Sequence, residues 1–172
     1  QIKSLQEGSD IMLGKPNQVA LPLAYWRNPR INPDKSNRLN PAKDGCGLLW
    51  YAPLIPMKKA SIETFIQFVR KICPKHGIEP LITFTNLRHD CIDATVPIVF
   101  NLEDASAVDS AHNCLNELIN SGRDFGFIPY RLSTEQQTKL NFTPVFWQTE
   151  RLIKESLDPN NVLQPGRYSH PA

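Results

Sequence analysis

Tyr130 and Arg131 are the adjacent side chains of this sequence best suited to hold an anion. A tyrosine hydroxyl and an arginine guanidinium can both donate to one oxyanion, and together they lower the pKa of a bound phenol. Neighbours on a regular strand face opposite ways, so both reach one ligand only at a strand end or bulge. The capping pattern that follows indicates such an end. The alternative is a half-buried tyrosine beside a surface arginine whose stem covers apolar residues.

Two other places could contribute to a site. Arg167 follows a Pro-Gly turn, which suits an anion contact but equally an exposed tail arginine. Trp50 and Tyr51 are neighbours in a strand-like segment, so one should face the core and the other the opposite side. The outward one is either a second core aromatic or the wall of a pocket.

Other catalytic and cofactor motifs are missing from the sequence. It contains no GxSxG, P-loop or GxGxxG pattern, and Glu103 and Asp104 are typical of a first helical turn. The four cysteines form no CxxC pair, and the four histidines show no HExxH or HxH spacing. We therefore expect the thiols to pack as small hydrophobic groups and expect no metal site.

Composition indicates a folded chain with few special partners. Of 172 residues, 41% are hydrophobic and 21% charged, which is enough apolar material for a packed core. The net charge is +2 with no Lys/Arg block, so neither nucleic acid nor a membrane is expected as a partner. The apolar runs are too short to span a bilayer. Because the first residue is Gln1, we expect the chain to begin inside a longer polypeptide or after processing.

Periodicity predicts two amphipathic helices between strands. The first covers residues 61–73, with Ser61 as its cap, and the second ends at Gly122. Four segments have the composition of strands, namely residues 46–55, 80–87, 94–100 and 125–131. The order strand, helix, strand, strand, helix, strand predicts an α+β fold of the split β-α-β, ferredoxin-like kind. Its antiparallel sheet should carry the helices on one face.

The flanking regions show weaker patterns. Residues 1–20 are polar with one turn signal, residues 21–29 look apolar and extended, and residues 30–45 look like a long loop. After the last strand, a capping box at Ser133 and a Thr143 cap followed by proline predict two short helices. The final residues lack periodicity and need another surface to lie against.

Several stretches together resemble one family. "CGLLWYAPLIPM", "ITFTNLRH", "VPIVFN", "PYR" and "LDPNNVLQPGR" occur in the order and spacing of the C-terminal part of the vanillyl-alcohol oxidase and p-cresol methylhydroxylase flavoproteins. "LPLAYWRNP" extends the likeness over nearly the whole chain. The "DPNNVLQPGR" tail is common to many FAD-linked oxidases, whereas "YR" before it is typical of the phenol-oxidising branch.

The resemblance implies a domain organisation. Residues 1–128 would be an incomplete substrate or cap domain, and residues 129–172 a C-terminal segment that packs on an FAD-binding domain absent from this chain. FAD is thus the implied cofactor, and that domain of the same protein the implied partner.

The resemblance also implies roles for individual residues. Tyr130 and Arg131 would bind the phenolate oxygen of a para-substituted phenol, such as a 4-alkylphenol or a 4-hydroxybenzyl alcohol. Hydride would then leave the para α-carbon for flavin N5 and give a quinone methide. Trp50, Leu54 and Thr83 would line the substrate cavity. Arg167 matches a basic tail residue that family members place close to the FAD.

The sequence departs from the family at two places. Leu48 stands where many relatives carry a histidine that bonds covalently to FAD, and no tyrosine lies between Trp26 and Tyr51 to replace it. Covalent attachment of FAD through this chain is therefore not supported. Thr83 and Pro97 stand near places where some members carry acidic groups, which leaves the fate of the quinone methide open.

Three hypotheses follow from the sequence. The chain is a fragment, inactive alone, of an FAD-dependent oxidoreductase that oxidises para-substituted phenols. Alternatively, the flavoenzyme oxidises a 2-hydroxy acid whose carboxylate Arg131 holds, or the chain is a non-enzymatic split β-α-β binding module. The electron acceptor (oxygen, a cytochrome or another), homo-oligomer formation and the cytoplasmic or periplasmic compartment of a soluble protein stay open.

Overall fold

The computed structural model describes residues 2–28, 38–137 and 143–167. The chain divides into two compact units, Gln1–Ile128 and Pro129–Ala172. The assignment of the first as a cap domain and of the second as a segment that packs on an FAD-binding domain stays a prediction.

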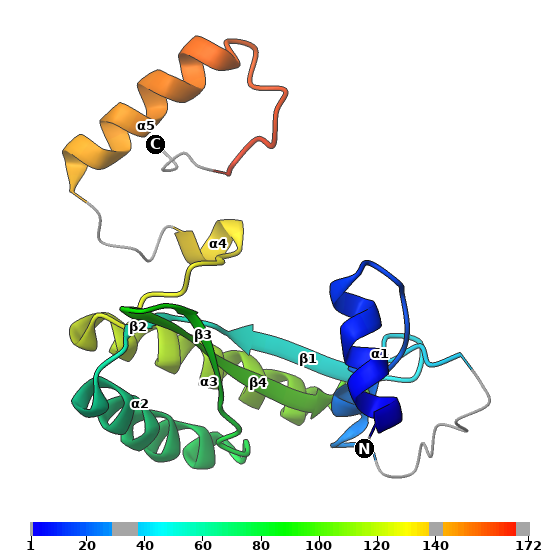
Figure 1. The fold of residues 1–172 in the computed structure, drawn as a ribbon. Coiled ribbons are helices and arrows are strands. Elements are labelled where there is room, and N and C mark those ends of the chain that lie inside the picture. Colours follow the sequence, from blue (N-terminus) through cyan, green and yellow to red (C-terminus); the bar gives the residue numbers. More distant parts are fainter. Residues whose placement is uncertain (1, 29–37, 138–142, 168–172) are drawn as a thin grey trace. The chain divides into compact units, whose positions relative to one another are not determined.

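The first unit is built on an antiparallel sheet around one long central strand, β4 (Cys91–Asn101). Strands β1 (Cys46–Tyr51) and β2 (Leu54–Pro56) pair with β4 in one continuous register, from Cys46 opposite Asn101 to Pro56 opposite Cys91. Strand β3 (Thr83–Arg88) pairs with the same end of β4 as β2, and so flanks it on the opposite side. The predicted α+β class with an antiparallel sheet is confirmed (Figure 1).

Two helices cover one face of this sheet. Helices α2 (Lys59–Ile72) and α3 (Ala105–Gly122) bury their apolar residues against it, as periodicity predicted. Helix α2 begins two residues before Ser61, which is therefore not its cap. Helix α3 is capped by Asp104, whose carboxylate accepts from the Ser106 and Ala107 amides. Those bonds lower the pKa of Asp104. A 3₁₀ turn, η2 (Cys73–His76), continues α2 to the left-handed Gly77.

Alternation along β4 explains why the helices lie on a single face. Every second residue is fully or nearly fully buried in the core and points toward the helices, and these are Ile92, Ala94, Val96, Ile98 and Phe100. The aromatic rings of Tyr51, Phe65, Phe68 and Phe127 complete this core. The Phe65 and Phe127 rings meet edge to face with centroids 5.1 Å apart.

Three expectations for local structure were wrong. The strand predicted at residues 125–131 is absent, because η3 (Arg123–Phe125) leads into left-handed Gly126 and Pro129 lacks an amide to continue a ladder. Residues 21–28 are not extended, since the proline in the first turn of η1 (Leu21–Tyr25) favours a helical turn, and Pro29 lies outside the described residues. Helix α1 (Ile2–Met12) forms where only a turn was expected, its apolar spacing being interrupted by Gly8.

In the described part of the second unit, residues 129–137 and 143–167, there are two helices and almost no core. Helix α4 (Thr134–Gln137) begins with the predicted capping box, in which Ser133 Oγ accepts from the Gln136 amide at 3.2 Å and Gln136 Oε1 accepts from the Ser133 amide at 3.0 Å. Helix α5 (Pro144–Leu157) has the predicted Thr143 cap. None of the α5 residues is buried, although several are large and apolar.

In the described ranges, every helix is either too short or too polar to cross a bilayer.

Gly122 is a site where even a methyl group should destabilise the fold. A Cβ there would lie 2.3 Å from Tyr51 Oη and 3.1 Å from the Phe127 carbonyl oxygen. Gly122→Ala should therefore lower the free energy of unfolding by about 1–3 kcal/mol through overpacking, measured by urea denaturation. Gly8→Ala is the matched control, since nothing lies within 4 Å of its Cβ and alanine favours a helix. Equal destabilisation by both substitutions would contradict this account.

Candidate functional site

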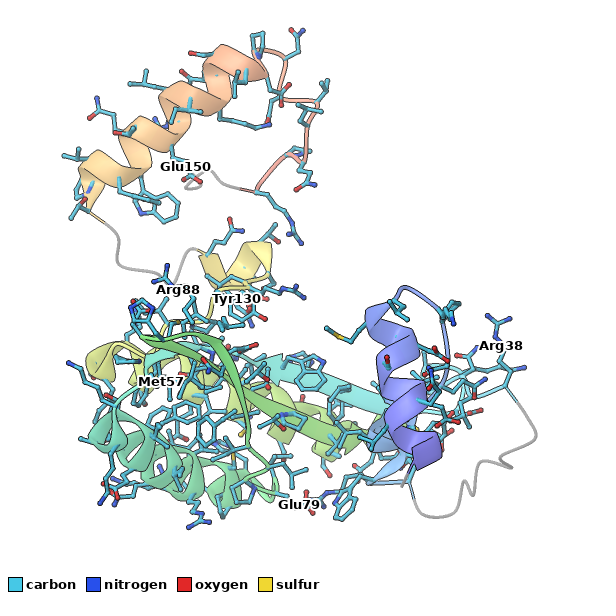
Figure 2. All side chains as sticks on the ribbon, in the orientation of Figure 1. Arg38, Met57, Glu79, Arg88, Tyr130 and Glu150 are labelled. Carbon is cyan, nitrogen blue, oxygen red and sulfur yellow. The ribbon has the colours of Figure 1, made fainter. Side chains whose placement is uncertain are left out.

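Tyr130 and Arg131 lie in a bend before α4, not in a strand. The Arg131 Cζ atom lies 5.4 Å from the centroid of the Tyr130 ring, a cation-π distance. The Tyr130 side chain is 45% exposed, Arg131 is also exposed, and Figure 2 labels Tyr130 in this segment. A regular strand would separate the two side chains, whereas the bend brings them together. The two side chains are therefore neighbours, which is the proximity that joint binding of one anion would need.

Trp50, Leu54 and Thr83 lie on one face of the sheet. Their direct partners on β4 are Pro97, Asp93 and Thr95 respectively, which alternate with the core residues of that strand. Directly paired residues of antiparallel strands point to the same side. The three predicted cavity residues, from three different strands, therefore share the face opposite α2 and α3.

This open face combines apolar area with hydroxyl groups. The Trp50 side chain is 49% exposed, and Leu54 and Thr83 are also exposed. Leu48, which pairs with Val99, lies on the same face two residues before Trp50. The Thr95 hydroxyl donates to the Thr83 carbonyl at 3.3 Å. An apolar surface with an exposed indole suits contact with a planar aromatic molecule.

The alternation at Trp50 and Tyr51 has a second consequence. Tyr51 is fully buried on the helix side, and its hydroxyl donates to the Phe127 carbonyl at 2.8 Å. Burial raises the pKa of this phenol. The Phe127 amide in turn donates to the Gly122 carbonyl at 2.9 Å, so both backbone groups of Phe127 are held. Phe127 precedes Tyr130 by only three residues, a reach of about 11 Å at most.

Arg167 lies elsewhere in the second unit, on the segment that follows α5. This segment returns along the helix because the Asp158 carboxylate accepts from the Val162 and Leu163 amides at 2.9 and 2.8 Å and pairs with Lys154. These contacts hold the pKa of Asp158 below its usual value, and the bond from Lys154 has the largest effect. The exposed Arg167 side chain lines the rim of the resulting groove.

The groove between α5 and the returning segment has a volume of about 560 Å³. Its walls are mainly apolar and include Ile153, Leu157, Val162 and Leu163. Glu150, labelled in Figure 2, also lines it, and burial raises the pKa of that carboxyl group. Among the described residues, Glu150 Oε2 has no hydrogen-bond partner. Exposed apolar surfaces of this kind usually contact another protein surface or a ligand.

Sequence reasoning found the outward Trp50 but missed what Tyr51 binds. The alternation of side chains along a strand predicts that one of the two aromatic residues faces the core, but it does not predict the hydrogen-bond partner of that residue. The groove was missed because its walls come from a helix and a segment without periodicity. Where the structure describes the chain, no three His, Cys, Asp or Glu residues gather as metal ligands.

Taken alone, the geometry defines a class: an α+β unit with one helix-covered and one open sheet face, followed by a helical segment. No family model matches the chain. It is 29% identical over 157 residues to 1'-carboxy-chondrochloren decarboxylase of Chondromyces crocatus, covering 91% of this chain and 28% of that protein. It is 24% identical over 161 residues to the flavoprotein subunit of 4-cresol dehydrogenase (hydroxylating) of Pseudomonas putida, covering 92% and 28%.

Solved structures agree with these relatives. p-Cresol methylhydroxylase with substrate bound matches with a TM-score of 0.74 at 23% identity, over 90% of this chain and 27% of that one. The 4-ethylphenol oxidase of Gulosibacter chungangensis, in complex with isoeugenol, matches with a TM-score of 0.61 at 25% identity, over 73% and 25%. The relatives thus include a flavoprotein subunit of a 4-cresol dehydrogenase, and the structural neighbours include p-cresol methylhydroxylase and 4-ethylphenol oxidase, as the motifs predicted. The chain spans 28% of the length of the curated relatives.

The Tyr51 hydroxyl should control the mobility of the segment that carries Tyr130. Tyr51→Phe leaves the buried Phe127 carbonyl without its donor, so we expect a loss of about 1–3 kcal/mol of stability and faster hydrogen exchange at residues 127–131. Hydrogen–deuterium exchange with mass spectrometry measures both effects.

Tyr25→Phe is the control for this prediction. The Tyr25 hydroxyl donates to Asp44 at 2.6 Å and accepts from the Asn40 amide, and burial with the Asp44 contact raises its pKa to about 12. Its removal should loosen residues 39–46 and leave residues 127–131 unchanged. Unaltered exchange at residues 127–131 in Tyr51→Phe would show that other contacts hold the segment.

Proposed function

We propose that this chain is part of an FAD-dependent oxidoreductase that oxidises para-substituted phenols, such as 4-alkylphenols or 4-hydroxybenzyl alcohols. The observation that carries the proposal is the likeness, over nine-tenths of the chain, to a flavoprotein subunit named for 4-cresol dehydrogenation. The 4-ethylphenol oxidase neighbour supports the same substrate class. Neither supports the alternatives of a 2-hydroxy acid substrate or a non-enzymatic module.

In this proposal Tyr130 and Arg131 bind the phenolate oxygen. The tyrosine hydroxyl and the guanidinium both donate, and the positive charge stabilises the ionised form of the substrate. An ionised phenol is richer in electrons at its para position, which favours loss of hydride from the para α-carbon. The 5.4 Å stacking of the two side chains supports their joint action on one oxygen.

Trp50, Leu54 and Thr83 line the substrate cavity in this proposal. They share the open face of the sheet, and the Trp50 indole offers a planar surface for an aromatic ring. The resemblance to the family, and not a measured distance, assigns these residues and the Tyr130–Arg131 pair to one substrate.

FAD, when bound, would accept the hydride. By the family resemblance, the cation of this chain that would meet FAD is the exposed Arg167, and the sequence contains no glycine-rich phosphate loop. We therefore propose that Arg167 contacts the cofactor and that most of its other contacts come from an FAD-binding domain of a longer protein. The uncovered apolar groove beside Arg167 and the lack of buried residues on α5 support packing against such a domain.

A protein electron acceptor is a further partner in this proposal. The Pseudomonas putida relative is named as a flavoprotein subunit, so at least one other subunit accompanies it. A cytochrome would suit this role, whereas the relative named an oxidase keeps oxygen as the alternative.

A second candidate function is oxidative decarboxylation. The Chondromyces crocatus relative is named a decarboxylase of a carboxylated compound and has a higher identity, 29%, than the 4-cresol dehydrogenase subunit. In that case the bond cleaved at the para side chain would be the one to a carboxylate. Release of carbon dioxide from a carboxylated phenolic substrate distinguishes this reaction from hydride loss alone.

Replacing Tyr130 tests the phenolate role in the full-length protein. Tyr130→Phe removes one donor, which raises the pKa of the bound phenol, so the rising limb of kcat against pH should move to higher pH. We expect kcat at neutral pH to fall by about 10- to 1000-fold on a 4-alkylphenol. Arg131→Met should lower kcat at least as much, whereas exposed Arg70→Met on α2 should leave it unchanged. A normal pH profile in Tyr130→Phe would refute the assignment.

The 172-residue chain by itself should be inactive. Since it supplies FAD with so few contacts, the purified chain should show no flavin absorbance after incubation with FAD and no turnover of 4-cresol. A full-length protein with in-frame flavin-binding residues should show both. A yellow, flavin-containing 172-residue chain would refute the proposed division of the site.

A further inference from the structure

Two buried cysteines meet inside the helix layer of the first unit. The Sγ atoms of Cys73, at the start of η2, and Cys114, on α3, lie 3.9 Å apart, and the Cys114 thiol donates to Cys73. Both residues are 0% exposed and 41 positions apart in the sequence. Neither thiol belongs to the open face or to the Tyr130–Arg131 pair.

A charged cluster holds the same two elements together about one turn further on. The Glu117 carboxylate of α3 accepts from Lys75 at 2.6 Å and contacts His76 Nε2 at 2.7 Å, both on η2. The hydrogen bond from Lys75, and to a smaller extent the contact with His76, holds the pKa of Glu117 below its usual value. These contacts therefore hold η2 against α3 next to the thiol pair.

The other two cysteines have different surroundings. Cys46 lies in a separate small cluster, where the Asn28 amide donates to its sulfur at 3.4 Å. Cys91 is half-buried at the start of β4. Cys73 and Cys114 are thus the two thiols whose sulfur atoms lie in mutual contact, and simple packing of small hydrophobic groups does not require that contact.

We propose that Cys73 and Cys114 are a disulfide-forming pair that crosslinks η2 to α3 under oxidising conditions. A disulfide needs sulfurs about 2 Å apart, so side-chain rotation and a small approach of η2 to α3 must close the remaining gap. Both elements already lie in contact, which keeps that approach small. The crosslink would enclose β3 and β4 in one loop and restrict the unfolded chain.

The oxidant is a small disulfide such as oxidised glutathione. The Cys73 thiolate attacks one of its sulfurs and expels one glutathione thiolate, which gives a mixed disulfide. The Cys114 thiolate then attacks Cys73 Sγ and expels the second. Two protein thiols lose two protons and two electrons, and one small disulfide becomes two thiols. Either thiol can make the first attack, because both orders give the same Cys73–Cys114 disulfide and two glutathione thiols. Because both thiols are buried in the fold, exchange occurs while the chain folds.

Disulfide mapping tests the pair. The full-length protein is refolded in a buffer of oxidised and reduced glutathione. It is then denatured in the presence of N-ethylmaleimide, which alkylates the free thiols. The protein is digested without reduction, and the peptides are identified by mass spectrometry. We expect the Cys73 and Cys114 peptides to be joined, two hydrogen masses below their sum, and Cys46 and Cys91 to be alkylated. The Tm should exceed that in dithiothreitol by roughly 5–10 °C.

Two variants make the test specific. Cys91→Ser should keep the link and the difference in Tm between the two buffers, and Cys73→Ala/Cys114→Ala should lose both. If the double variant does not fold, the mapping on the wild-type protein still decides. Alkylation of all four cysteines after the oxidising refold, or links from Cys46 or Cys91 of equal abundance, would overturn the proposal.

Discussion

The hydrogen bond from Tyr51 to the Phe127 carbonyl is the contact on which the first unit most depends. It joins the first strand to the turn that ends the last helix of the unit, across 76 positions of sequence. Gly122 has no side chain because the phenol occupies that space, and the Phe127 ring fills the core beside Phe65. The buried Tyr51 phenol thus requires glycine at position 122. It also holds the turn at Phe127, from which the chain continues to Tyr130 and Arg131.

The central strand then separates structural from functional chemistry. Its even-numbered residues build the core with the helices, and its odd-numbered residues pair with Trp50, Leu54 and Thr83 on the other side. Substitutions of the exposed Trp50, Leu54 and Thr83 therefore need not disturb the core on the helix side, because these side chains point away from it. Trp50 and Tyr51 illustrate the separation, since adjacent aromatic residues serve the open face and the anchor.

The sequence predicted those features that depend on local periodicity. Helices α2 and α3, the antiparallel strands, the Ser133 capping box and the Thr143 cap all follow from spacing and side-chain chemistry. The strand expected at residues 125–131 failed because composition alone does not reveal that Gly126 adopts a left-handed turn and that Phe127 bonds to α3 and β1. Long-range bonds of this kind, and the Cys73–Cys114 contact, depend on tertiary packing and have no local signal.

In the second unit, polar contacts rather than a buried apolar core hold the described elements together. Helix α5 leaves Leu152, Ile153 and Leu157 exposed. The segment after α5 is held against the helix largely by the polar contacts of Asp158 and Lys154 rather than by a core. Polar contacts at a helix end contribute little beside the apolar burial that usually stabilises a helix. A further surface that covered the groove would supply that burial and would also fix Arg167 at its rim. The requirement for stability and the proposed approach of this segment to FAD thus point to the same neighbouring domain.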